Sequence, residues 1–137
     1  MPPRVFLDAN VLLDFLLKRK NYIISRQLIA MAQAGTIRAL ISPAVLHIIA
    51  YWVTKEHGAK LSKKVILALL DEILVVDATH EIAVQAVQSA NSDIEDALQY
   101  FTALHHKADY LLTWDKHFLK YSTPTLRVIS PDDFIGL

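Results

Sequence analysis

Four aspartates stand where a folded chain could bring them together for chemistry. Asp8 directly follows an apolar run at residues 5–7, and Asp115 closely follows a second run, YLLT. Asp93 and Asp96 lie about one helical turn apart in the stretch SDIEDALQYF. Carboxylate oxygens are ligands that Mg²⁺ and Mn²⁺ prefer. A divalent cation held this way can activate water and stabilise an in-line displacement at phosphate, so the spacing favours metal-dependent phosphodiester chemistry.

The elements that must position these acids can be traced from the apolar pattern. Short apolar runs predict strands, and apolar residues at helical spacing predict helices between them. The expected strands are residues 4–8, 38–41, 73–76, 110–113 and 127–129. Strands that alternate with helices are typical of an α/β fold with a parallel sheet covered on both faces. Sites in such sheets lie beyond the carboxyl ends of the strands, which is where Asp8 and Asp115 fall.

Helix starts and stops are marked by capping residues. Ser42 followed by proline predicts an N-cap, and Gly58 predicts the end of that helix. Further helices are expected to open at Ser62, Thr79 and Ser92.

The acids near residue 95 can be separated by their spacing. Ser92 and Glu95 match a capping box, so we expect Glu95 to serve the helix start. Asp96 shares a helix face with Asp93, beside the apolar stripe, whereas Gln99 falls with Glu95 on the polar side. Asp96 is therefore the expected site residue of this helix, with Asp93 in support.

Each of the other candidates also has a purely structural interpretation. Asp8 could be a loop acid or helix cap, and Asp115 a turn acid. Asn10 and Thr113 could cap or hydrogen-bond locally, or could hold a ligand carboxylate or water. Asp14 stands opposite the apolar stripe of its helix with Lys18 four residues on, which predicts a solvated ion pair.

Composition narrows the class of protein. The length of 137 residues suits one domain spanning 1–137, and 53% apolar content allows a sizeable core. There are no cysteines and no signal-like or membrane-length apolar segment, so we expect a cytoplasmic protein with no membrane association. Net charge is zero, so any nucleic-acid contact has to use local patches.

Taken together, these segments resemble the PIN-domain family of metal-dependent nucleases. The matching stretches are VFLDANVLLDFL, SDIEDALQYFTALHHKADYLLTWDKHF and RVISPDDF. The resemblance implies a three-layer α/β/α sandwich with a mainly parallel sheet of four or five strands. It implies Mg²⁺ or Mn²⁺ held by Asp8, Asp96 and Asp115, with Asn10, Asp93 and Thr113 in support. It also implies cleavage of RNA, and many members are toxins paired with an antitoxin and form homodimers.

The sequence departs from the family pattern at one place. The family places a carboxylate about one turn into the helix after the second strand. Here that helix reads SPAVLHIIAYWVTKEHG, the matching region offers His47, and no acid occurs before Glu56. His47 is therefore a candidate replacement ligand, or else a partly buried histidine of the core.

Three hypotheses follow. The first is a Mg²⁺- or Mn²⁺-dependent endoribonuclease, as the toxin of a toxin–antitoxin pair. The second, motivated by the absent acid, is a catalytically degenerate PIN-like module that binds RNA or a protein partner. The third is a phosphotransferase or receiver-like domain with Asp8 as nucleophile, which fits poorly because Asn10 stands where a second acid is expected. A mean hydropathy of +0.30 makes a homodimer interface plausible.

Overall fold

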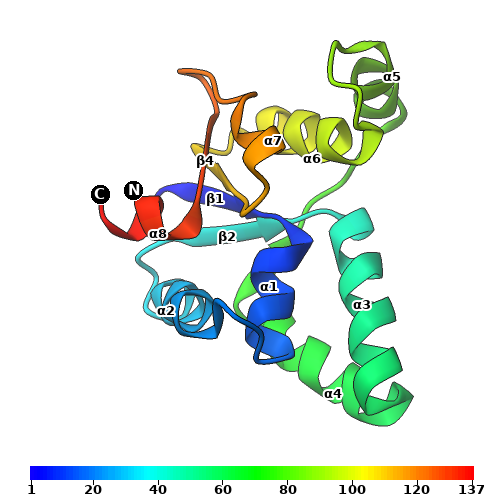
Figure 1. Ribbon diagram of the computed structural model, residues 1–137, viewed down its shortest axis with the longest axis vertical. Coiled ribbons are helices and arrows are strands. Elements are labelled where there is room, and N and C mark those ends of the chain that lie inside the picture. The colour runs from blue at the N-terminus through cyan, green and yellow to red at the C-terminus, as the bar shows by residue number, and fades with distance from the viewer.

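The computed structural model describes all 137 residues and contains one five-stranded parallel sheet (Figure 1). The strand order is β3-β2-β1-β4-β5, and all four pairings are parallel. The strands are β1 (Arg4–Leu7), β2 (Arg38–Ile41), β3 (Ile73–Val75), β4 (Tyr110–Leu112) and β5 (Arg127–Ile129). The prediction of five short strands is confirmed, and the sheet is parallel throughout.

Eight helices flank this sheet. They are α1 (Ala9–Leu16), α2 (Tyr22–Gln33), α3 (Pro43–His57), α4 (Ala59–Leu70), α5 (His80–Gln88), α6 (Ile94–His105), α7 (Lys116–Leu119) and α8 (Pro131–Ile135). Figure 1 shows α1 and α2 on one side of the sheet and α5 and α6 on the other, which confirms the three-layer α/β/α architecture. None of the helices combines the length and apolar character that crossing a bilayer would require.

The central strand explains why the site lies where it does. Val5 and Phe6 of β1 are fully buried, as expected for a strand covered on both faces. Leu7 pairs with Leu112 of β4, so the carboxyl ends of the two strands are level. The backbone N–H of Asp8 continues this pairing by donating to the Leu112 carbonyl at 3.0 Å. The residues that follow β1 and β4 therefore emerge side by side at one edge of the sheet.

Two helix starts differ from the sequence prediction. Ser42 caps α3 as expected, its Oγ accepting from the Val45 N–H at 3.2 Å. Ser62, however, does not open a helix, because α4 already begins at Ala59. Gly58 adopts φ +82°, a left-handed conformation that suits glycine, and it separates α3 from α4 as a single shared residue. Ser62 is instead buried within α4.

The start of α6 is also one residue later than predicted. Asp93, and not Ser92, is the N-cap, and its Oδ1 accepts from the Asp96 N–H at 3.1 Å. The Asn91 side chain accepts from the Asp93 N–H at 2.9 Å and fixes the turn before the cap. The predicted capping role of Glu95 is therefore wrong, because the N–H of the N-cap residue Asp93 is bound by the Asn91 side chain.

The expectation of a solvated pair between Asp14 and Lys18 is wrong as well. Asp14 is only 8% exposed within α1. Helix α1 packs against both α2 and α3, so the face opposite its leucine stripe is covered rather than open to water. Lys18 lies beyond the end of α1 in a left-handed conformation, with φ +51°.

Candidate active site

Asp8 is the best-anchored acid of the predicted site. It occupies the N-cap position of α1, but its side chain makes no capping hydrogen bond. Instead, Thr113 donates its hydroxyl to Asp8 Oδ2 at 2.7 Å, and Gln99 donates Nε2 to Asp8 Oδ1 at 3.1 Å. All three side chains are buried, and Thr113 is 0% exposed. Each oxygen of the Asp8 carboxylate is therefore held by a neutral donor from another element.

Thr113 links Asp8 to the next acid along the edge. Its hydroxyl oxygen accepts from the Asp115 backbone N–H at 3.1 Å. Asp115 in turn caps α7, and its Oδ1 accepts from the His117 N–H at 2.9 Å. Asp115 is exposed, unlike Asp8. One hydroxyl thus sets both the orientation of a buried carboxylate and the turn that carries an exposed one.

Helix α6 contributes Asp96, a buried acid with an unpartnered carboxylate oxygen. Asp96 is 6% exposed, and its Oδ2 is buried without a hydrogen-bond partner. Asp93, one residue before the helix, is exposed and uses its Oδ1 for the cap. A buried carboxylate oxygen without a partner is costly, so Asp96 is the acid of this group with the most to gain from a proton or a cation.

The acids act on one another electrostatically. Burial, followed by repulsion from Asp93, Asp115, Asp8 and Glu95, raises the pKa of Asp96 to about 7. Burial also raises the pKa of Asp8, against the lowering effect of its hydrogen bonds from Thr113 and Gln99. The pKa of Glu95 is raised by partial burial and by the charges of Asp8 and Asp93. The three segments thus form one acidic region at the carboxyl edge of the sheet.

The donor chemistry of this region suits a hard divalent cation, although the side chains are not gathered around one point. The donors are carboxylate oxygens, and the unpartnered Asp96 Oδ2 lies among mutually repelling acids. No group of three or more His, Asp or Glu side chains is close enough to hold one ion in this arrangement. A bound cation would therefore have to draw the carboxylates inward, relieving the repulsion that raises the Asp96 pKa.

Two supporting candidates lie farther from this chemistry. Asn10 is exposed in the first turn of α1 and forms no side-chain hydrogen bond to Asp8, whose oxygens are held by Gln99 and Thr113. His47 is exposed one turn into α3, so it does not belong to the core, and it joins no metal-binding group.

Gln99 was missed by the sequence interpretation, which placed it on the polar side of its helix. It is 2% exposed and contacts Asp8, and Thr102 on the same helix is buried too. Gln99 lies three residues after Asp96, a spacing that puts the two side chains on one face. That spacing to a suspected site acid was the available signal.

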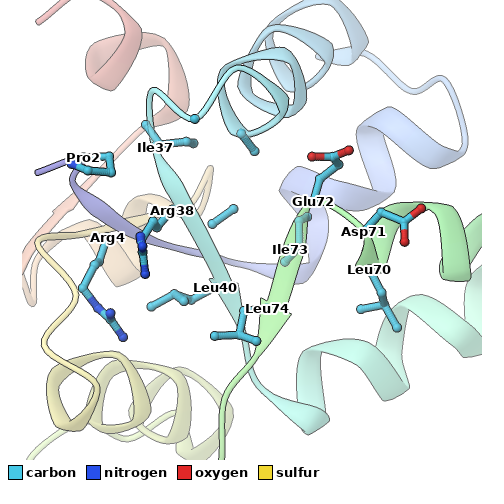
Figure 2. A pocket seen from close by; sticks show the side chains of 13 residues that line it. Pro2, Arg4, Ile37, Arg38, Leu40, Leu70, Asp71, Glu72, Ile73 and Leu74 are labelled. Carbon is cyan, nitrogen blue, oxygen red and sulfur yellow. The ribbon is translucent and has the colours of Figure 1, made fainter.

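A separate hollow lies at the other end of the strands and is distinct from the acidic region. Figure 2 shows Arg4 and Arg38 on one side of this hollow and Asp71 and Glu72 on the other. Its volume is about 440 Å³, and it reaches across β2 to β3. None of the predicted site residues lines it, so the chemistry expected from the sequence is not in this hollow.

Comparison with known proteins agrees with this fold. Among solved structures, the toxin–antitoxin complex from Klebsiella pneumoniae contains a similar chain, with a TM-score of 0.70 and 21% identity over 93% of this chain and 97% of that one. VapBC2 from Rickettsia felis, bound to a DNA fragment from its promoter, gives a TM-score of 0.67 and 18% identity over 91% and 96%. Mycobacterium tuberculosis VapC20, a sarcin–ricin-loop-cleaving toxin, gives a TM-score of 0.65 and 14% identity over 83% of this chain and 92% of that one.

At the level of sequence, no curated protein matches the chain. A family model described as "PIN domain" matches residues 4–117. This match takes in β1 to β4 and the whole of the acidic region from Asp8 to Asp115. The protein therefore belongs to the PIN-domain family.

Proposed function

We propose that this protein is a Mg²⁺- or Mn²⁺-dependent endoribonuclease and the toxin of a toxin–antitoxin pair. The observation that carries the proposal is the contrast between Asp8 and Asp96 at the carboxyl edge of the sheet. Both are buried, but Asp8 has both oxygens held by neutral donors, whereas Asp96 keeps one oxygen unpartnered. Membership of the PIN-domain family supports nuclease chemistry at this edge.

The proposed roles follow from these contacts. Asp8, Asp96 and Asp115 would hold the cation, and when bound it would activate water and stabilise charge on the phosphate oxygens. Thr113 keeps the Asp8 carboxylate oriented and sets the turn that presents Asp115. Asp93 caps α6, so it holds the helix turn that carries Asp96. Lys116 and His117, which are exposed next to Asp115, would meet the RNA backbone.

The proposed partners are supported by the neighbours and by exposed apolar surface. The Klebsiella and Rickettsia neighbours were solved as toxin–antitoxin assemblies, so we propose an antitoxin partner here, together with a homodimer. Large apolar side chains are exposed on α4, β3 and α5, namely Leu61, Leu67, Leu74, Val84 and Val87. Such surface is typical of protein contacts. The proposed location is the cytoplasm, where RNA and an antitoxin would meet the enzyme.

The proposal is tested by incubating the purified protein with single-stranded RNA and, in parallel, with DNA of the same sequence. We expect RNA cleavage with Mg²⁺ or Mn²⁺, none with EDTA, and little cleavage of DNA. Asp96→Asn should cleave the RNA far more slowly than wild type does. Equal residual activity in the two proteins would mean that a contaminant is the nuclease.

A second candidate function is a degenerate PIN module that binds RNA or a protein without cleaving. The observation that favours it is that His47 is exposed, in a helix whose only acid is Glu56, and that no three potential ligands converge. Calorimetric titration with Mn²⁺ separates the two functions. Micromolar binding that disappears in Asp8→Asn would exclude the degenerate module, and its absence in wild type would favour it.

A further inference from the structure

Gln99 joins helix α6 to the carboxylate that follows β1, a contact between residues 91 positions apart. Its Nε2 donates to Asp8 Oδ1 at 3.1 Å from a side chain that is 2% exposed. Its other polar atom, Oε1, is buried without a hydrogen-bond partner. The amide thus satisfies Asp8 while leaving itself half satisfied.

Packing alone does not explain an amide at this position. A buried acceptor without a partner costs free energy, and an apolar side chain of similar length would avoid that cost. Ala103, one turn after Gln99, is buried as well, so an apolar side chain is accepted on this face of α6 beside the polar Asp96 and Thr102. What an apolar side chain cannot provide is the donor to Asp8. The feature of Gln99 that distinguishes it from methionine or leucine is therefore its contact with the carboxylate.

The two donors to Asp8 have complementary effects. With Thr113 alone, one oxygen would be fixed and the carboxylate could still pivot about that contact. Gln99 holds the second oxygen from another element, so the plane of the group is set. A charged carboxylate also selects the amide orientation that presents N–H rather than oxygen. Because Gln99 and Asp96 share a helix face, the same contact fixes how far α6 lies from Asp8.

We propose that Gln99 is a positioning residue that holds the Asp8 carboxylate in register with Asp96. Its consequence for catalysis rests on the proposed nuclease function, whereas the contact itself does not. Groups that orient a ligand carboxylate contribute to metal affinity and rate without touching the substrate. The loss of Gln99 should therefore lower Mn²⁺ affinity and kcat in addition to its effect on stability.

The test compares Gln99→Met with Thr102→Val. Thr102 is a matched control because it is buried on the same helix, and its hydroxyl bonds only within α6, to the Leu98 carbonyl. We expect Gln99→Met to weaken Mn²⁺ binding by about tenfold or more and to lower kcat with little change in KM. Its thermal midpoint should fall, because Asp8 Oδ1 is left buried without its donor. Thr102→Val should leave Mn²⁺ affinity and kcat unchanged. Unchanged Mn²⁺ affinity and kcat in Gln99→Met would overturn the inference.

A measurement on the metal-free protein separates this inference from the proposed function. The side-chain amide of Gln99 gives NMR signals that should move when Asp8 is changed to Asn, and stay in place in Glu56→Gln. If wild type neither binds Mn²⁺ nor cleaves RNA, the nuclease proposal fails, and the amide shift alone then decides for or against the contact. If the Gln99 amide signals do not move in Asp8→Asn, the positioning role is refuted, whatever the activity of the protein.

Discussion

Thr113 donates its hydroxyl to Asp8 across 2.7 Å, although 105 residues separate the two. The contact exists because β1 and β4 are neighbours in the sheet and end at the same level. The same hydroxyl also accepts a hydrogen bond from the Asp115 N–H. The chain thus connects its first and last proposed catalytic acids through one buried side chain.

Replacing Thr113 by valine should destabilise the protein and impair the site together. Valine keeps the volume but removes one donor and one acceptor, leaving a buried carboxylate oxygen without its partner. We expect a loss of about 1–3 kcal/mol in the free energy of unfolding, measured by urea denaturation. Thr125→Val, at an exposed position, should change it by less than about 0.5 kcal/mol. Equal stability in both variants would mean that the contact with Asp8 contributes nothing.

The metal-free protein should lose stability as the pH rises from about 5 to 8. The pKa of Asp96 is about 7 in the folded chain against a usual value of 3.8, so the folded state binds more protons in this window than the unfolded state. The stabilisation that Asp96 gives by binding a proton is complete near pH 3.8 and is lost as the pH rises through about 7. We expect a change on the order of 1 kcal/mol, measured by urea denaturation at several pH values. Asp96→Asn should flatten this dependence, and an equally steep profile in that variant would refute the assignment.

Mn²⁺ should stabilise the folded protein, and this effect should weaken below pH 7. A ligand at one hundred times its dissociation constant adds roughly 2.7 kcal/mol to the stability of the state it binds. Asp96 has to lose its proton before it can bind a cation, so acid competes with the metal. Thermal unfolding with and without Mn²⁺ at pH 6 and pH 8 measures the effect. It should vanish in Asp8→Asn and persist in Glu56→Gln, and persistence in both would place the cation elsewhere.

Changing His47 to glutamate should strengthen Mn²⁺ binding. His47 lies one turn into α3, where the family pattern has its acid, and it is exposed and free to be replaced. An added carboxylate raises the charge of the ligand set, and we expect about tenfold tighter binding by calorimetry, equal to roughly 1.4 kcal/mol. Tyr51→Glu, one turn farther along α3, is the matched control. Equal binding in wild type and His47→Glu would show that this turn of α3 does not face the cation.

Much of the fold was predictable because each strand carries a local signal. Short apolar runs located the five strands, and Ser42 with its following proline located the start of α3. The errors came where two residues compete for one cap. Asp93 is the N-cap of α6 in place of Ser92, because the Asn91 side chain fixes the preceding turn. Helix α4 begins directly after Gly58 and therefore before Ser62. Such outcomes depend on three-dimensional turn geometry that spacing does not specify.

The site was only partly predictable for a related reason. The positions of Asp8 and Asp115 follow from the rule that parallel strands place their carboxyl ends together. The burial of Asp14 and Gln99 cannot be predicted from that rule, because it depends on which elements pack against the polar face of a helix. Gln99 looked like a surface residue until the approach of β1 to α6 was known.

The most direct test of the account is the rate of RNA cleavage by wild type, Asp96→Asn and Glu56→Gln under single-turnover conditions with saturating Mn²⁺. Glu56 is exposed near the far end of α3 and controls for the loss of one negative charge. We predict that Asp96→Asn slows cleavage by at least about 100-fold, while Glu56→Gln stays within about twofold of wild type. Cleavage at the wild-type rate by Asp96→Asn, or none by wild type, would contradict it.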